Sequence, residues 1–425
     1  MNYIEARHLI TNYLKKHYPK IVSNDEIEAI ITHWLLNPDI CPPYISKKAF
    51  NACRQLFGLS PISKENEFLV REEPSPYQLK FDLTHENIPY PAPGNSEFRF
   101  IDLFAGIGGF RIAFQNAGGK CVFTSEWDKH AKKTYEANFG EVPYGDIRKT
   151  NKKEIPEHDV LCAGFPCQPF SLAGVSKKNS LGRKHGFADE TQGTLFFEIL
   201  EILKLKRPKA FFLENVKNLL THDKKHTFEV IRHSLGDDLG YVINWIIVDG
   251  AKWVPQHRER IFIVGFNPAK IRIKKEEITI PDKPGNGYKY SELSDIIQKK
   301  VDGYTLGPGT WATLERHKKH HAAEGNGFGY GLHKLPIPEG TVTRTISARY
   351  HKDGAEILIE QRGQRPRRLT VEEAMQLQGY DPKKFVFPVS QTQAYKQIGN
   401  SVVVPAIEAT AKEIVKILKD KKRCQ

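Results

Sequence analysis

The chain has 425 residues, enough for two or three domains and a sizeable core. Its 63 Lys and Arg outnumber 50 Asp and Glu, and the net charge of +13 favours a polyanionic partner, nucleic acid above all. No apolar run is long enough to span a bilayer and the first residues do not resemble a signal peptide, so we expect a cytoplasmic protein with no membrane partner. The six cysteines include no Cys-x-x-Cys pair, which disfavours a zinc site and a disulfide framework.

Residues 1–70 are predicted to form a separate helical module. Apolar residues recur at helical spacing in three stretches, near residues 6–14, 27–34 and 49–57. Ser23 followed by Glu26 has the spacing of a capping box for the second helix, and the third helix begins near Ser46. Three short helices are compatible with a DNA-binding helix-turn-helix. They fit a docking or stabilising bundle equally well, and we favour that interpretation.

A proline-rich linker, residues 71–96, precedes the first strand, Phe98–Leu103. A glycine-rich turn follows, in which Gly106 and Gly108 let the backbone pass close beneath a bound ligand before a helix begins near Arg111. The spacing of these glycines is not G-x-G-x-x-G. The dinucleotide fingerprint is therefore not met, which disfavours an NAD-dependent dehydrogenase.

The next strand, residues 121–124, ends at a second group of candidate ligands. Glu126 follows the glycines by about 20 residues, the position from which an acidic residue binds the ribose hydroxyls of a nucleotide. Trp127 offers a face for stacking on adenine, and Asp146, in a Gly-Asp-Ile turn, is placed to accept from an exocyclic amine. These features predict an adenosine site without a pyrophosphate cradle, which suits S-adenosylmethionine better than NAD.

A buried strand over residues 160–163 leads into a loop in which Pro166 and Pro169 bracket Cys167. In open α/β sheets, ligands bind at the carboxyl ends of the strands, so this thiol is a candidate nucleophile in its thiolate form. Because free cysteines are often buried, a purely structural cysteine in a turn is the alternative. The residues of this stretch leave both interpretations open.

Two further strands carry charged candidates. A strand over residues 209–213 ends at Glu214, which is either a site carboxylate or a surface residue at a turn. Arg258 and Arg260 precede a strand over residues 261–265 and, being two residues apart, are expected to point the same way. They could meet a base and a phosphate, or form a solvated face.

In this order the motifs resemble those of the bacterial DNA (cytosine-5)-methyltransferases, closest to the Dcm and EcoRII-type group. The motifs are FIDLFAGIGGF, SEWD, GDI, GFPCQPFS, LENV, QHRERIFIVG, RRLTVEEAMQLQGY and QAYKQIGNSVVVP. The resemblance implies an α/β, Rossmann-like methyltransferase fold with a mixed, mostly parallel sheet. It divides the chain into a catalytic domain over residues 97–265, a smaller target-recognition domain over 266–366, and C-terminal motifs over 367–425. In these last motifs, a helix near residues 405–418 is expected to return to the catalytic domain.

The resemblance also implies roles for individual residues. Cys167 adds to C6 of a flipped-out cytosine, Glu214 holds and protonates N3, and Arg258 and Arg260 steady the ring oxygen and the thiolate. The S-adenosylmethionine pocket is assigned to Phe104, Gly106, Gly108, Glu126, Trp127, Asp146, Ile147, Pro166 and Asn400. A glycine-rich, basic loop over residues 171–194 is expected to close over the base.

For double-stranded DNA, the expected contacts are Gln168, Ser171, Arg183, Arg344 and Arg349. The last two are candidate readers of guanine in the inner-cytosine target CCWGG, with CCGG and CCNGG as alternatives. The resemblance further leads us to expect a nucleoid-associated monomer, and it leaves open whether the enzyme acts alone or beside a restriction endonuclease for the same site. An RNA cytosine methyltransferase or a non-catalytic DNA-binding regulator are the competing interpretations. We expect no metal, because the His-rich stretch 316–321 has no cysteine or carboxylate to complete a zinc set.

Overall fold

The computed structural model describes residues 3–22, 25–57, 59, 61, 88–166, 195–325 and 329–420. Four of the predicted site residues, Cys167, Gln168, Ser171 and Arg183, lie outside the described residues, as does the predicted loop over 171–194. Most of the predicted linker lies outside them too. Among the described helices, none is long and apolar enough to cross a membrane.

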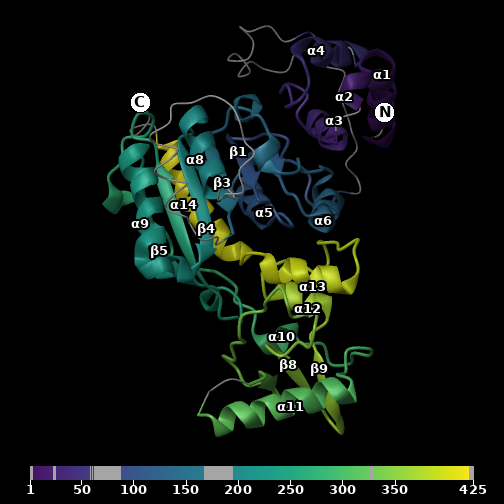
Figure 1. Ribbon diagram of the computed structural model, residues 1–425, viewed down its shortest axis with the longest axis vertical. Coiled ribbons are helices and arrows are strands. Elements are labelled where there is room, and N and C mark those ends of the chain that lie inside the picture. The colour runs from purple at the N-terminus through teal and green to yellow at the C-terminus, as the bar shows by residue number, and fades with distance from the viewer. Residues whose placement is uncertain are drawn as a thin grey trace.

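A six-stranded sheet forms the centre of the molecule, in the order β2-β1-β3-β4-β6-β5 (Figure 1). Its strands are β1 Phe98–Leu103, β2 Gly119–Ser125, β3 Val160–Gly164, β4 Ala210–Val216, β5 Val242–Asp249 and β6 Glu259–Phe266. The first four are mutually parallel, and β6 runs antiparallel to both of its neighbours. The mixed, mostly parallel sheet that the sequence predicted is confirmed.

Helices cover both faces of this sheet because its strands are apolar on both sides. The helices of this part are α5 Gly109–Asn116, α6 Lys129–Phe139, α8 Leu195–Lys206 and α9 His226–His233. Phe100 and Phe212 face one side, where they pack in one buried cluster with α5 and with the C-terminal helix α14 Val404–Lys419. The alternate residues, such as Ile101 and Phe211, belong to the cluster beneath α8 and α9 on the other side.

Strand β4 extends further than the sequence indicated. Its expected end was Leu213, but it runs through Glu214 to Val216. The reason is the antiparallel partner β6, whose ladder with β4 continues as far as the pair Val216 and Arg260. Glu214 is therefore held inside a strand and not in a turn.

The N-terminal helices are α1 Tyr3–His17, α2 Pro19–Val22, α3 Ile27–Leu36 and α4 Lys47–Leu56. They enclose a small apolar cluster of their own, and α3 also sends Ala29 and Ile30 into the cluster beneath α8 and α9. Ser46 caps α4 as expected, accepting from the N–H of Ala49 at 3.2 Å. Glu26 is the N-cap of α3 and its side chain makes no capping hydrogen bond, while Ser23, the other residue of the predicted capping box, lies outside the described residues.

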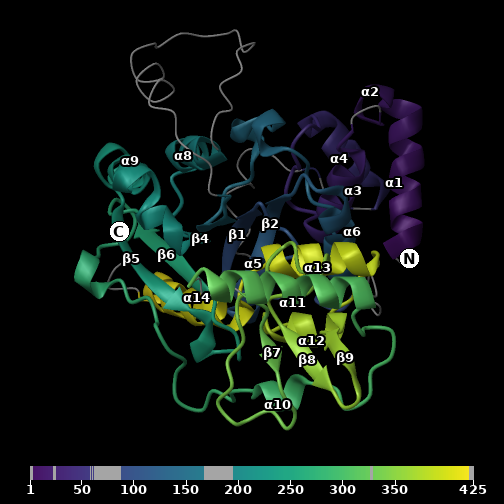
Figure 2. The same ribbon diagram turned by 60° about the horizontal axis from the view of Figure 1, so that its bottom comes forward.

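The remaining elements form the end of the molecule that lies opposite the N-terminal helices, and the connection between that end and the central sheet (Figure 2). They are α10 Leu293–Ile296, α11 Pro308–Ala323, β7 Leu332–His333, β8 Leu358–Gln361, β9 Gln364–Arg368, α12 Val371–Gln376 and α13 Gln391–Asn400. Strands β7, β8 and β9 form a second, small sheet, and α11 lies beside it. The C-terminal helix α14 packs along α5, where Asn116 donates to Glu408 at 2.8 Å.

Candidate active site

A cavity of about 810 Å³ opens at the carboxyl ends of the parallel strands. Most of the described residues that the sequence predicted for the catalytic and cofactor sites line it. They are Phe104, Gly106, Glu126, Trp127, Asp146, Ile147, Pro166, Glu214, Arg258, Arg260 and Asn400. They lie in the loops after β1, β2 and β3, in the turn at residues 146–147, in β4, in and just before β6, and in α13, so only the folded chain brings them together.

The glycine turn after β1 has two different glycines. Gly106 has φ +55°, and a Cβ there would meet nothing within 4 Å, so its backbone faces open space in the cavity. Gly108, the N-cap of α5 with φ +85°, does not line the cavity, because a Cβ there would lie 2.3 Å from the ring of Phe139. Gly108 thus serves helix packing, and Gly106 is the glycine that leaves room for a ligand.

Glu126 connects the glycine turn to the tip of β2. Its two carboxylate oxygens accept from the N–H of Gly106 at 2.8 Å and from the N–H of Asp128 at 2.7 Å. Burial raises the pKa of Glu126 above its usual value, and the backbone hydrogen bonds oppose that shift. Each oxygen keeps a lone pair that can accept from a hydroxyl group. Trp127 beside it is 72 % exposed, so its ring is open for stacking.

Asp146 already has a protein partner. Arg148 donates through its Nε to the carboxylate at 2.9 Å, and its backbone N–H donates to Oδ1 at 3.0 Å. The hydrogen bond from Arg148 holds the pKa of Asp146 below its usual value. Ile147 is buried at the floor of the cavity, and Asn400, at the end of α13, is exposed at its rim.

Glu214 and Arg260 form an ion pair in the wall of the cavity. Glu214 Oε1 lies 3.0 Å from Arg260 Nε, and the side chains are 10 % and 18 % exposed. Burial raises the pKa of Glu214 above its usual value, and the nearby guanidinium groups offset part of that effect. A carboxyl group with a raised pKa, next to a fixed cation and open to a cavity, is suited to proton exchange with a bound base.

Arg258 has a different position from the one expected. Its guanidinium is buried and donates to three backbone carbonyls, those of Ile346 at 3.2 Å, Gly399 at 3.0 Å and Ser401. Burial lowers its pKa to about 9. Its donors thus hold the backbone at residues 346, 399 and 401 against the sheet, and a contact of Arg258 with a base or a phosphate stays a prediction.

Asn215, which was not among the predicted site residues, holds the start of the loop that follows β3. Its side-chain amide donates to the carbonyl of Phe165 at 2.9 Å, across from β4 to the end of β3. Pro166 follows at the cavity wall, and Cys167 is the next residue, outside the described part of the chain. The Glu-Asn-Val motif is the sequence signal that could have identified Asn215, because one strand end supplies both the site carboxylate and the amide that holds the neighbouring loop.

Gln256 is a second residue that was missed. Its side chain accepts from the N–H of Ile346 at 2.7 Å and donates to the carbonyl of Leu377 at 2.7 Å. It thereby holds the segment that carries Arg344 and Arg349 beside β6, and both of these arginines are exposed. Arg344 donates to the carbonyl of Gly329.

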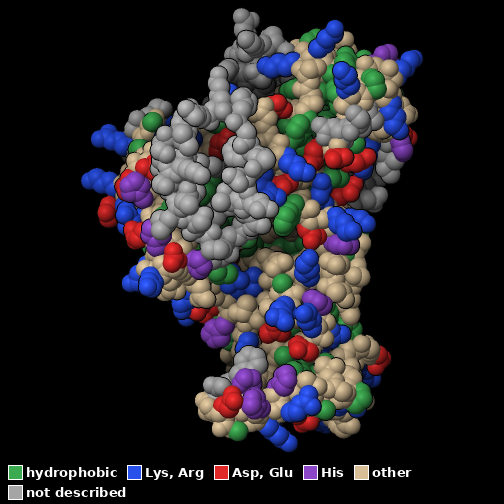
Figure 3. All heavy atoms as spheres, viewed as in Figure 1, with side chains coloured by type: hydrophobic (Ala, Val, Ile, Leu, Met, Phe, Trp, Pro, Cys, Tyr) green, Lys and Arg blue, Asp and Glu red, His purple; other side chains and the backbone are tan. Residues whose placement is uncertain are grey.

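The histidine-rich stretch lies on α11, at the end of the molecule where Figure 3 shows histidine side chains gathered. His320 approaches Glu324 at 3.3 Å, an exposed pair one helical turn apart. Within the described ranges, no group of three His, Cys, Asp or Glu side chains is arranged to hold a metal ion.

The mixed α/β fold, with a cavity at the carboxyl ends of its parallel strands, is that of the S-adenosylmethionine-dependent methyltransferases. Residues 98–416 match the model of the C-5 cytosine-specific DNA methylases, and the chain belongs to this family. It is therefore a DNA cytosine-C5 methyltransferase of the restriction-modification type whose methyl donor is S-adenosylmethionine. The open face of Gly106, the Glu126 carboxylate and the exposed Trp127 ring fit that donor.

Several relatives support this assignment over most of the chain. Type II methyltransferase M.SsoII of Shigella sonnei is 50 % identical over 333 residues, which cover 78 % of this chain and 83 % of that protein. The DNA-cytosine methyltransferase of Escherichia coli (strain K12) is 48 % identical over 369 residues, which cover 74 % of this chain and 77 % of that protein. The crystal structure of the S. pombe Dnmt2 methyltransferase shares the fold, with a TM-score of 0.59 at 17 % identity, over 76 % of this chain and 100 % of that one.

Proposed function

We propose that Cys167 is the nucleophile and that the enzyme methylates a cytosine flipped out of a duplex. The ion pair of Glu214 and Arg260 is the observation that carries the proposal, since it places a carboxyl group of raised pKa and a cation at the cavity wall. The loop fixed by Asn215 enters the same wall at Pro166, one residue before Cys167. A base inside a stacked duplex could not reach this cavity, which is why the cytosine must leave the helix.

In the proposed reaction, the Cys167 thiolate adds to C6 of the cytosine, and Glu214 gives a proton to N3. The added electron pair then resides at C5, which becomes nucleophilic. Bound S-adenosylmethionine supplies the methyl group that C5 takes. A base removes the C5 proton, the C6–sulfur bond breaks, and the thiolate is regenerated while N3 returns its proton to Glu214. Arg260 holds the Glu214 carboxylate and faces the ring oxygen throughout.

Trapping on a fluorinated duplex tests the nucleophile. Fluorine at C5 cannot leave as a proton does, so a 5-fluorocytosine duplex incubated with S-adenosylmethionine should give a stable covalent adduct. Cys167→Ala should give none while retaining DNA affinity. An adduct that survives this substitution would remove Cys167 from the role.

For the target we propose the inner cytosine of CCWGG, with CCGG and CCNGG as alternatives. The proposal is supported by the likeness of the segment over residues 341–359 to that of the Dcm and EcoRII-type enzymes, and by the exposure of Arg344 and Arg349 beside β6. A bidentate arginine contact to guanine is worth about 1–3 kcal/mol of discrimination. Arg344→Ala should therefore relax the site at one position without abolishing binding.

Bisulfite sequencing of DNA from cells that express the protein decides among these targets. Methylcytosine mainly outside a CC…GG context would refute all three, and methylation confined to CCGG would refute CCWGG. We further propose that the enzyme acts as a monomer on nucleoid DNA, with a restriction endonuclease of the same specificity as a possible companion. Analytical ultracentrifugation and digestion of host DNA test these two points.

A further inference from the structure

We propose that the N-terminal helices are a positioning element of the cofactor site, and that Glu26 is the residue through which they act. Glu26 lies outside the residues matched by the family model, 98–416. The segment it contacts, residues 140–146, connects α6 to the turn that carries Asp146 and Ile147. The inference rests on the proposed contact of Asp146 with the adenine of S-adenosylmethionine.

The segment 140–146 is held from outside by the N-terminal helices at successive positions. Tyr3 donates through its hydroxyl to the carbonyl of Gly140 at 2.6 Å. Thr32 Oγ1 accepts from the N–H of Val142 at 3.0 Å. Between these two contacts, His33 Nε2 lies 3.0 Å from Glu141 Oε1. These contacts all come from residues 3–33, so one compact group of helices holds the whole segment.

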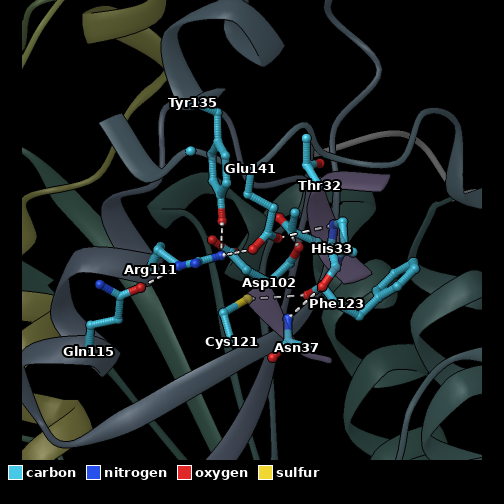
Figure 4. Close-up of polar contacts among 12 residues, drawn as sticks. Thr32, His33, Asn37, Asp102, Arg111, Gln115, Cys121, Phe123, Tyr135 and Glu141 are labelled. Carbon is cyan, nitrogen blue, oxygen red and sulfur yellow. Dashed lines mark hydrogen bonds and ion pairs between the residues drawn. The ribbon is translucent and has the colours of Figure 1, made fainter. Parts of the chain in front are cut away.

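Glu141 also joins this segment to the catalytic core. It forms a fully buried ion pair with Arg111 of α5 at 3.0 Å, and Arg111 donates to the hydroxyl of Tyr135 at 3.1 Å (Figure 4). In Figure 4, His33 from α3 and Arg111 from α5 approach Glu141 from opposite sides. Side chains from both parts of the chain therefore contact Glu141, and the ion pair with Arg111 fixes it.

Glu26 makes the contact nearest to the cavity. Both of its carboxylate oxygens lie 3.0 Å from the N–H of Gly145, the residue before Asp146. The carbonyl of Gly145 accepts from Ser125 at the tip of β2 at 2.7 Å. The fit is close, since a Cβ on Gly145 would lie 2.6 Å from Glu26 Oε1. Gly145 is therefore held between the N-terminal module and strand β2, which ends one residue before Glu126.

Charge-assisted hydrogen bonds to backbone N–H groups are roughly twice as strong as neutral ones. Without the Glu26 carboxylate, the Gly145 N–H loses its partner and the turn at Asp146 is held from one side only. The orientation of Asp146 and Ile147 toward the cavity then becomes less well defined, and cofactor binding has to restore it at a cost in affinity.

The test measures the affinity of the full-length protein for S-adenosylhomocysteine, the demethylated product, by calorimetry. Glu26→Ala should raise the Kd about tenfold, as expected for the loss of one charge-assisted hydrogen bond, while the Kd for duplex DNA stays within about twofold. Glu28→Ala is the matched control on the same helix, because its carboxylate pairs with Arg7 and does not touch the segment. It should leave both affinities unchanged.

A double-mutant cycle with Asp146→Ala separates positioning from simple loss of stability. If Glu26 acts through the Asp146 turn, adding Glu26→Ala to Asp146→Ala should raise the Kd by much less than it does alone. Full additivity, or an unchanged Kd in Glu26→Ala, would overturn the inference. If Asp146→Ala alone leaves the Kd unchanged, the proposed adenine contact fails instead. Glu26→Gln, which keeps one acceptor oxygen, should fall between the wild type and Glu26→Ala.

Discussion

Glu214 and Arg260 face each other from two antiparallel strands, with the carboxylate Oε1 3.0 Å from the guanidinium Nε. In the ladder between β4 and β6, Glu214 is opposite Phe262 and Val216 is opposite Arg260. Glu214 and Arg260 are thus diagonal neighbours on one face of the sheet. The pair depends on β6 running antiparallel to β4, because this direction brings Arg260, near the start of β6, beside Glu214, near the end of β4.

Glu214→Gln should separate catalysis from stability. Loss of the acidic proton should lower kcat by about 10²–10⁴. The pKa of Glu214 is raised by burial in the folded protein, so its contribution to stability is present below the unfolded pKa of 4.5 and is lost as pH rises through the folded-state pKa. The variant should therefore gain stability relative to wild type as pH rises above 4.5, measured by urea unfolding. A loss that grows with pH would contradict the raised pKa.

Arg258→Ala should act mainly on the stability of the protein and only secondarily on catalysis. It leaves the buried carbonyls of Ile346, Gly399 and Ser401 without their donor, at a cost of roughly 3–5 kcal/mol. Urea unfolding measures this loss. Arg260→Ala is the comparison, since Arg260 is partly exposed and faces Glu214: it should reduce kcat strongly and stability less. Equal stability losses in the two variants would refute the division of roles.

Asp146→Ala should raise the KM for S-adenosylmethionine and leave DNA affinity little changed, because the proposed hydrogen bond is to adenine. Arg148→Ala gives the informative contrast. Arg148 now occupies the Asp146 carboxylate, so its removal should free that carboxylate and leave the cofactor KM equal or lower. Steady-state kinetics with each substrate varied measures both effects. A raised KM in Arg148→Ala would mean that this ion pair orients Asp146 for binding.

His33 predicts how stability responds to acid. Burial lowers its pKa from 6.5 to about 4. Between pH 6.5 and 4 the unfolded chain therefore binds a proton that the folded protein does not bind, so the free energy of unfolding decreases as the pH falls through this range. The loss attributable to this residue is about 3 kcal/mol. Chemical unfolding of wild type and His33→Gln across this range should show a flatter profile for the variant. Parallel profiles would contradict a neutral, buried His33.

Much of the sheet was predictable from local patterns. Strand β1 was placed without error, and β2, β3 and β6 were placed within two residues, because apolar runs ended by glycine or polar clusters are local signals. The end of β4 was misplaced because its last residues are paired by a strand more than forty positions away. The residues in and around β4 do not by themselves show that β6 will pair with its last residues.

The sequence by itself determined the chemistry: Gly106, Glu126, Asp146 and Glu214 were identified as site candidates from motif order and position at strand ends, and all four line one cavity. Only the tertiary structure decided which charged groups are free to act. It showed Arg258 committed to backbone carbonyls, Arg260 paired with Glu214, and Glu26 attached to Gly145 across 119 residues. The physical reason is that a charged group that loses water on folding needs a polar partner, and that partner can come from any part of the chain that the fold brings near. The spacing of residues along the sequence does not show which partner that is.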